Sequence, residues 1–451
     1  MPKITFMGAG STVFAKNIIG DSFCAPALSD SEIALYDIDA ERLRQSEAML
    51  NTINKNINSG RAKIKTFLGV ENRKKALKGA NFVVNAIQVG GYEPSTVIDF
   101  EIPKKYGLRQ TIADTLGIGG IFRTLRTLPV MLDFAADMEK VCPDAWLLNY
   151  TNPMAMLTGG MLRGTSVKTV GLCHSVQENA LWLLDSLGLL PSGVDYKHGL
   201  RQKVAGINHM AWLLEVDING KDMYPAIKAA AAAKVEESLR QKDITKKSYD
   251  MVRLDLIRHF GYYITESSEH NAEYTPYWIK RARPELIDKY RIPLDEYPRR
   301  CVNQIAGWKK QYKDVCENPA LTHKRTHEFG SYIMEAITTN VPFQIAGNVL
   351  NKGFITNLPA DCCVEVPCLV DANGVQGTYV GALPPQCAAL NLTNINVQNL
   401  TIEAVLTKKR EHIYHAALLD PHTAAELAID DIVKLCDELI AAHGDYLPKY
   451  K

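Results

Sequence analysis

Residues 4–13, with the sequence ITFMGAGSTV, decide the fold of this chain. The apolar run at the start predicts a short buried strand, and the glycines predict a tight turn that leads into a helix. Such a turn lets backbone N–H groups approach a pyrophosphate at the positive end of the helix. Val13 stands where the usual pattern has a third glycine, so a plain tight turn stays an alternative. The residues expected to contact the nucleotide are Gly8, Gly10, Ser11 and Thr12.

The next predicted strand, residues 33–37, supports a dinucleotide site because it ends in Asp37. A carboxylate at this position accepts hydrogen bonds from both ribose hydroxyls and would repel a 2′-phosphate, which favours NAD over NADP. A solvated aspartate at a strand end is the alternative. Gln88 opens the stretch QVGGY after the third predicted strand, where a doubly wound fold places a ligand-facing loop.

Short apolar strands alternate with helical stretches over the first ~175 residues, which is typical of a parallel sheet wrapped by helices. From residue 204 onward the alternation fails. We therefore expect an α/β protein with a Rossmann-type doubly wound parallel sheet in residues 1–180 and a second, mixed α+β domain in residues 181–451. The expected strands are residues 3–7, 33–37, 82–86, 146–149, 169–172, 211–217 and 362–370, and the expected helices are 40–57, 123–141 and 226–239.

Composition excludes several classes of protein. Of 451 residues, 51 are basic and 50 acidic, so the net charge of +1 provides no long-range field to attract nucleic acid or an anionic membrane. No window approaches the ~18 to 20 apolar residues that would cross a bilayer, and the N-terminus leads into a glycine turn instead of a secretory segment. The ten cysteines have neither the density of a disulfide scaffold nor the spacing of a zinc ribbon. We therefore expect a cytoplasmic protein with no nucleic-acid or membrane partner.

Polar residues follow the later strands of the predicted parallel sheet. Asn149 and Asn152 lie in the stretch NYTNP, where their amides could bind sugar hydroxyls or turn the chain before Pro153. Asp114 opens the glycine-containing stretch DTLGIGG, residues 114–120, which is either a second ligand-facing loop or a structural turn.

A cysteine and a histidine follow two further predicted strand ends. Cys173 in GLCHS and His209 in GINHM could together hold one divalent cation and leave positions open for substrate and water. Two ligands make an incomplete site, so a buried thiol and a satisfied core histidine are the simpler interpretation, and a thiolate would suggest zinc before manganese. Residues 261–278 are dense in acids and aromatics and include His270, which is consistent with a sugar site or with the rim of an amphipathic helix.

Taken together, these segments resemble glycoside hydrolase family 4, the NAD- and manganese-dependent glycosidases, and within it the bacterial α-galactosidase (melibiase) branch. The similarity runs the whole length of the chain and includes the stretches QTIADTLG (110–117), GLCHSVQ (171–177), GINHMA (206–211), TESSEH (265–270) and NINVQ (394–398). The resemblance implies that Cys173 and His209 are protein ligands of Mn²⁺, in place of the simpler interpretation above. It also implies a homodimer or homotetramer.

The resemblance further implies a redox-neutral hydrolysis of an α-galactoside, outside the usual scheme with two carboxylates. NAD⁺ would take a hydride from C3 of the sugar, and Tyr274 would remove the C2 proton with Asp114 increasing its basicity. The leaving group is then eliminated, water adds, and the hydride returns. His270 is the alternative base.

The phosphoglycosidases of the family have an aspartic acid directly after the metal-ligating cysteine as proton donor, whereas this chain has His174 there. Either His174 donates the proton or the elimination proceeds with little acid help. No basic residues match those that bind a 6-phosphate, and the near-zero net charge agrees with an unphosphorylated substrate.

Other functions stay open at this point. Within the family, these are α-glucosidase and α-galacturonidase activity. An NAD-dependent 2-hydroxy acid dehydrogenase would share the nucleotide-binding half, and we expect an architecture like that of lactate and malate dehydrogenases. Such an enzyme would release NADH steadily, whereas the family reaction returns the hydride. The complete set of cofactor, metal and base residues argues against a sensor without catalysis.

Overall fold

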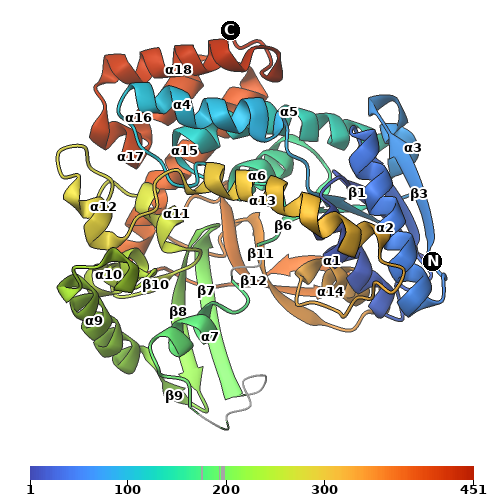
Figure 1. Cartoon of the computed structure of the whole chain (residues 1–451), viewed down its shortest axis with the longest axis horizontal. Helices are drawn as coiled ribbons and strands as arrows, with labels where there is room; N and C mark the ends of the chain where they lie inside the picture. Colours follow the sequence, from blue (N-terminus) through green and yellow to red (C-terminus); the bar gives the residue numbers. More distant parts are fainter. Residues whose placement is uncertain (174–175, 192, 194–198) are drawn as a thin grey trace.

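The computed structural model describes residues 1–173, 176–191, 193 and 199–451 (Figure 1). Among these residues, thirteen strands form one sheet with the order β10-β8-β7-β12-β11-β6-β5-β4-β1-β2-β3, while β9 pairs with β8 and β13 with β12. The strands are β1 Lys3–Met7, β2 Glu32–Asp37, β3 Lys63–Leu68, β4 Phe82–Asn85, β5 Trp146–Asn149, β6 Lys168–Gly171, β7 Leu200–Ile207, β8 Met210–Ile218, β9 Lys221–Asp222, β10 Tyr263–Ile264, β11 Phe343–Leu350, β12 Cys363–Asp371 and β13 Gly374–Gly377.

The helices are α1 Thr12–Cys24, α2 Ala40–Asn58, α3 Arg73–Leu77, α4 Val97–Lys105, α5 Gly117–Val141, α6 Met154–Gly164, α7 Asn179–Ser186, α9 Tyr224–Arg240, α10 Met251–Phe260, α11 Ser268–Glu273, α12 Glu285–Tyr290, α13 Glu296–Tyr312, α14 Phe329–Thr339, α15 Pro385–Thr407, α16 Glu411–Leu419, α17 Pro421–Glu426 and α18 Ile429–His443. Within the described part of the chain, no helix is long and apolar enough to span a membrane.

The first six strands are all parallel and adopt the order β3-β2-β1-β4-β5-β6. This is the strand order of the Rossmann fold, and in such a sheet ligands bind at the carboxyl ends of the strands. The strands β1, β2, β4, β5 and β6 form where the sequence predicts them. Strand β3 was not expected, because its residues are mostly exposed and two of them, Lys63 and Lys65, are lysines.

The sheet continues without a break into antiparallel strands from the second half of the chain. Asn348 of β11 pairs with Gly171 of β6, and Glu365 of β12 pairs with Gly206 of β7. Parallel pairing therefore ends at β6 while the sheet goes on. The division into domains 1–180 and 181–451 stays a prediction.

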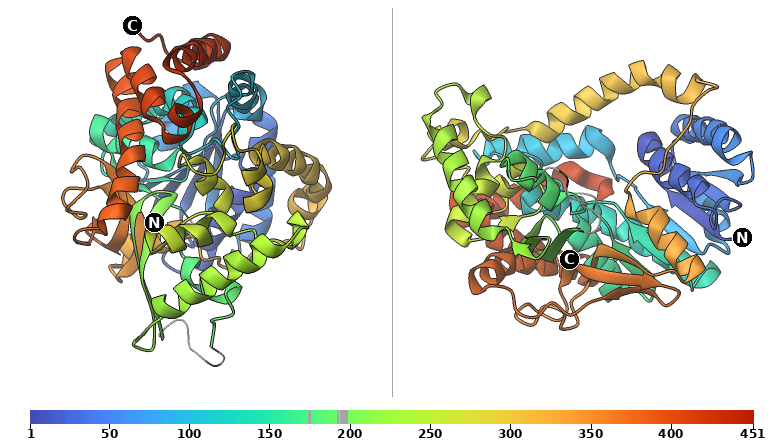
Figure 2. Two further views of the ribbon diagram at one scale, coloured as in Figure 1. Left: turned by 90° about the vertical axis from the view of Figure 1, so that its left-hand side faces the viewer. Right: turned by 90° about the horizontal axis from the view of Figure 1, so that it is seen from below.

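The C-terminal helices pack back onto the first half of the molecule. Helix α15 contacts α5 and α6. Helix α18 contacts α4, and these two are the red and cyan helices at the top of Figure 1. Helix α13 crosses the molecule from the side of α11 and α12 to α2, visible as the long yellow-orange helix in Figure 2.

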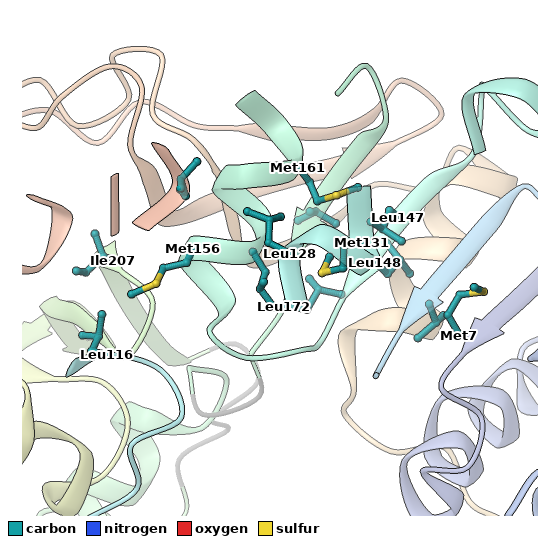
Figure 3. Close-up of a cluster of buried hydrophobic side chains, with 14 of the residues drawn as sticks. Met7, Leu116, Leu128, Met131, Leu147, Leu148, Met156, Met161, Leu172 and Ile207 are labelled. Carbon is teal, nitrogen blue, oxygen red and sulfur yellow. The ribbon is translucent and has the colours of Figure 1, made fainter. Parts of the chain in front are cut away.

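A shared core joins the two halves. Leu128 of α5 and Met156 of α6 are fully buried beside Leu148 of the parallel sheet and Ile207 of β7 (Figure 3). Burial of apolar side chains stabilises the folded state by about 25 cal/mol per Å². Because the buried side chains are closely packed, the cluster also fixes the two halves relative to each other.

Candidate active site

Cys173, His209 and Glu266 bring one ligand atom each to a common point, with all three atoms within 4.8 Å of one another. Cys173 Sγ lies 3.6 Å from His209 Nε2, and this nitrogen lies 3.4 Å from Glu266 Oε2. A thiolate, an imidazole and a carboxylate are suitable ligands for a divalent transition metal. These side chains fit the predicted metal site and add a third candidate ligand, Glu266, that the sequence did not indicate.

His209 reaches this point from the tip of a hairpin. Strands β7 and β8 pair up to Ile207 and Met210, so that only two residues make the turn. His209 adopts a left-handed backbone with φ +63°, which residues other than glycine seldom adopt. The tight turn aims the imidazole back toward Cys173, which follows β6 in the parallel sheet.

Glu266 comes from the chain that leaves the edge of the same sheet. Strand β10 pairs with β8, and the Thr265 N–H donates to the carbonyl of Ala211 at 2.8 Å. Glu266 also has a left-handed backbone, with φ +66°, and the guanidinium of Arg253 donates to its carbonyl oxygen. The segment 261–278 was singled out for its acids, but no local spacing linked Glu266 to Cys173, 93 positions earlier.

Tyr274, the predicted base, lies beside the candidate metal ligands and is fully buried. Its hydroxyl is 3.3 Å from His209 Nδ1, whereas the other ring nitrogen of His209 faces Cys173. Burial raises the pKa of Tyr274 well above its ordinary value, and the negative charges of Asp114 and Glu273 raise it further. A nearby positive charge is therefore needed before this phenol can act as a base near neutral pH.

Asp114 and His270 complete the same group of side chains. Asp114 accepts hydrogen bonds from Thr115 Oγ1 at 2.9 Å and Asn152 Nδ2 at 3.2 Å, and lies 3.8 Å from His270 Nε2. His270 Nδ1 is 2.6 Å from the Ser267 hydroxyl, and its ring centroid is 5.1 Å from that of His209. The expected loop at residues 114–120 is shorter than predicted, because α5 begins at Gly117.

Asn149 differs from Asn152 in its surroundings. It is fully buried, and its amide oxygen accepts from Asn85 Nδ2 at 2.9 Å and from the Thr151 N–H at 3.1 Å. Its amide nitrogen donates to Thr158 Oγ1 at 3.2 Å, so its polar atoms already hold the turn after β5. A contact from Asn149 to a sugar stays a prediction, as does the role of His174, which lies outside the described residues.

The predicted nucleotide residues lie at the same edge of the sheet. Gly8 has φ +86°, and a Cβ there would lie 2.7 Å from the Ala86 carbonyl oxygen. The Gly10 N–H donates to Asp37 Oδ2 at 2.5 Å, and a Cβ on Gly10 would lie 2.8 Å from the same oxygen. Both glycines are therefore required by the packing of the turn. The carboxylate of Asp37 lies where it could accept hydrogen bonds from a ribose.

The remaining predicted nucleotide contacts surround this turn. Thr12 is the first residue of α1 and is buried, while Ser11 before it is exposed. Gln88 is exposed after the carboxyl end of β4. The turn, the start of α1 and Asp37 fit an adenine dinucleotide.

Comparison with known proteins identifies the family. The model of the family 4 glycosyl hydrolases matches residues 3–188, and that of the family 4 C-terminal domain matches residues 204–423. An α-galactosidase from Bacillus subtilis (strain 168) is 58% identical over 451 residues, covering 100% of both chains. An α-galactosidase from Rhizobium meliloti is 34% identical, covering 99% of this chain and 89% of the relative.

Solved structures support the fold. A 6-phospho-α-glucosidase from gut microorganisms in complex with NAD and Mn²⁺ superimposes with a TM-score of 0.79 at 19% identity, covering 100% of both chains. The lactate dehydrogenase of Cryptosporidium parvum gives a TM-score of 0.51 at 13% identity, covering 90% of this chain and 98% of the other. The predicted α/β architecture, like that of lactate dehydrogenase, is thus confirmed, and the chain belongs to family 4 of the glycosyl hydrolases.

Proposed function

We propose that this family 4 enzyme is an NAD- and manganese-dependent α-galactosidase acting on unphosphorylated, melibiose-type α-galactosides. Full-length identity of 58% to an α-galactosidase supports the sugar specificity. The observation that carries the chemistry is that one side chain, His209, faces the metal ligands with one ring nitrogen and the base Tyr274 with the other.

Two groups of residues would hold the cofactors. Cys173, His209 and Glu266 would hold the cation, and the turn at residues 8–12 with Asp37 would hold the dinucleotide. When bound, NAD⁺ supplies a hydride acceptor, and the cation supplies Lewis acidity together with positive charge next to the buried phenol.

Tyr274, in its phenolate form, would take the C2 proton of the sugar onto its oxygen and become the neutral phenol. With the His209 proton on Nδ1, the Nδ1–H donates to the phenolate oxygen and stabilises it, while Nε2 keeps its lone pair for the cation. The charge of Asp114 makes the phenolate a stronger base, because it disfavours the charged form of Tyr274. Asn152 and Thr115 hold the carboxylate of Asp114 in place.

His270 lies between Asp114 and Glu266 and would donate a hydrogen bond to a sugar hydroxyl. The proton for the leaving group is assigned to His174 from the sequence alone. Removal of the C2 proton by Tyr274 requires neither of these two histidines.

The test uses dialysed enzyme and nitrophenyl α-galactoside. Hydrolysis should require both NAD⁺ and Mn²⁺, while the absorbance of NADH stays flat over many turnovers. Nitrophenyl α-glucoside and α-galacturonide should react much more slowly, and faster turnover of either would reassign the specificity within the family. Stoichiometric release of NADH from a hydroxy acid, without hydrolysis of any glycoside, would identify a dehydrogenase instead.

We also propose a cytoplasmic homodimer or homotetramer. The requirement for NAD⁺ favours the compartment that holds this cofactor. Exposed apolar side chains, such as Val302 at 52% and Ile305 at 48% on α13, favour association with another copy. Light scattering on the purified protein would measure the oligomeric state.

A further inference from the structure

Glu273 is a buried carboxylate that the proposed mechanism does not use. It is the last residue of α11, directly before Tyr274, and is only 3% exposed. Its two oxygens accept hydrogen bonds from three consecutive backbone N–H groups of residues 111–113. Thr111 N donates to Oε2 at 2.8 Å, Ala113 N donates to Oε1 at 2.8 Å, and Ile112 N lies 3.3 Å from both oxygens.

These three amides depend on Glu273 for their hydrogen bonds. In the part of the chain that the structure describes, their N–H groups have no other acceptor. Hydrogen bonds from a backbone segment to a carboxylate are stronger than those to a neutral acceptor, and three of them together fix the segment as a concave nest. Glu273 therefore determines the path of the chain immediately before Asp114.

The segment held in this way has an unusual backbone. Ala113 adopts φ +52°, in the left-handed region that alanine seldom adopts. A Cβ on Gly119 would lie 2.4 Å from the carbonyl oxygen of Ala113, so the segment also packs tightly on the start of α5. A second bond to α11, from Thr111 Oγ1 to the carbonyl of Glu269 at 2.7 Å, holds the other end of the segment.

The same short helix thus helps to position both Tyr274 and Asp114. Tyr274 follows α11 in sequence, and Asp114 follows the segment that the side chain of Glu273 binds. We propose that Glu273 is a positioning residue that fixes Asp114 relative to Tyr274 by holding the backbone of residues 111–113, and thereby sets the rate of C2 proton removal. This proposal rests on the proposed function, since it assigns Glu273 a part in that reaction.

The substitution Glu273→Gln tests the role of the second oxygen with almost no change of shape. A glutamine would turn its NH₂ group toward either the Thr111 or the Ala113 N–H, so a donor would face a donor. Glu273→Asp keeps both oxygens but is one methylene shorter, and serves as the second variant if Glu273→Gln does not fold. Leu435→Ala, in the buried face of α18, is a matched control that lowers stability without touching the segment.

The first measurement is hydrogen exchange of the protein without NAD⁺ or metal. Peptides covering residues 108–116 should exchange about tenfold faster, or more, in Glu273→Gln, because one of the two acceptor oxygens of these N–H groups is lost. In Leu435→Ala the same peptides should change no more than the rest of the protein. Unchanged exchange in Glu273→Gln would overturn the proposal at its first step, whatever the protein catalyses.

The second measurement separates the proton transfer from the hydride transfer. In Glu273→Gln, kcat should fall about ten- to a hundredfold with KM within about threefold, and a larger fraction of enzyme should show the absorbance of reduced nicotinamide at steady state. Deuterium from heavy water should enter C2 more slowly by the same factor as kcat. Leu435→Ala should leave kcat, the fraction of reduced nicotinamide and the rate of deuterium entry at their wild-type values.

The outcomes of the two measurements are distinct. Faster exchange of residues 108–116 with a normal kcat would show that Glu273 is only structural and would overturn the proposal. A wild-type protein without NAD-dependent galactosidase activity would instead refute the proposed function, and the hydrogen-exchange result would stand independently of that failure.

Discussion

The nucleotide turn and the metal–base cluster lie at the same edge of one sheet, but the chain builds them in different ways. The turn comes from one contiguous stretch, residues 4–13, plus one aspartate at the next strand end. It offers backbone N–H groups, and glycine is required because the Ala86 backbone leaves no room for a Cβ at Gly8 and the side chains of Asp37 and Arg42 leave none at Gly10. The cluster gathers side chains from several distant segments. A site made of local backbone can be recognised from a short stretch of sequence, whereas a site made of convergent side chains depends on the whole fold.

This difference predicts that each site can be destroyed without loss of the other. The largest effect is expected for the proposed metal ligands: Cys173→Ser or His209→Ala should lower kcat/KM on the order of ten-thousandfold, because the Lewis acid and its charge are lost. NAD⁺ affinity, measured by calorimetry, should stay within about twofold. The control is Cys24→Ser, a half-buried free thiol on α1. Near wild-type activity in Cys173→Ser would return that thiol to a purely structural role.

Removing the base should have the next largest effect. Tyr274→Phe should lower release of galactose about a thousandfold and should stop entry of deuterium from heavy water into C2. Tyr290→Phe removes a hydroxyl that bonds to Asp255 outside the cluster, and should keep full activity. Should Tyr274→Phe still exchange the C2 proton at the wild-type rate, His270 becomes the base to test.

The nucleotide turn can be broken by a single methyl group. Gly10→Ala would place a Cβ 2.8 Å from Asp37 Oδ2 and 2.9 Å from Arg42 Cβ, so we expect NAD⁺ binding to weaken about ten- to a hundredfold. Metal binding, followed by titration of the protein without NAD⁺, should not change. Gly307→Ala is the matched control, because its Cβ would meet nothing within 4 Å. Equal losses in the two variants would mean that the turn does not bind the cofactor.

The smallest effect on catalysis is expected at Glu365 of β12, where a substitution should change the pH dependence of stability instead. Burial raises the pKa of Glu365 from 4.5 to about 7, partly opposed by the hydrogen bond from Asn348. The folded protein therefore keeps a proton that the unfolded chain loses, and the free energy of unfolding should fall by up to about 3 kcal/mol as pH rises from 4.5 to 7. In Glu365→Gln this part of the pH dependence should disappear. Parallel urea unfolding curves for both proteins across this range would measure it, and identical slopes with pH would contradict it.

The sequence predicted those parts of the fold that have a strong local pattern. Strands β1 and β5 begin and end at the expected residues, because they are short apolar runs between turn residues. Strand β3 lies at the edge of the sheet, where exposed lysines replace the apolar alternation, and only its pairing with β2 reveals it. The unbroken sheet from β6 into β11 was equally invisible, because a pairing between Gly171 and Asn348 leaves no local signal.

The site was predictable in proportion to the resemblance to a known family. Residue chemistry alone favoured a structural role for Cys173 and His209, and the resemblance reversed this interpretation. Glu266 was missed because no spacing linked it to Cys173 or His209, and the resemblance, although it includes the stretch TESSEH (265–270), assigned Glu266 no role. Its convergence with the other two ligands depends on the pairing of β10 with β8.

The left-handed backbones of His209 and Glu266 mean that the site works against the stability of the chain. Each such conformation costs about 1 kcal/mol or more for a residue with a Cβ, whereas glycine adopts it freely. Substitution by glycine would relieve this backbone cost, but at His209 it would also empty a buried position and remove the contact with the Tyr274 hydroxyl. The positions of these two side chains are therefore explained by the chemistry of the site and not by the stability of the backbone that carries them.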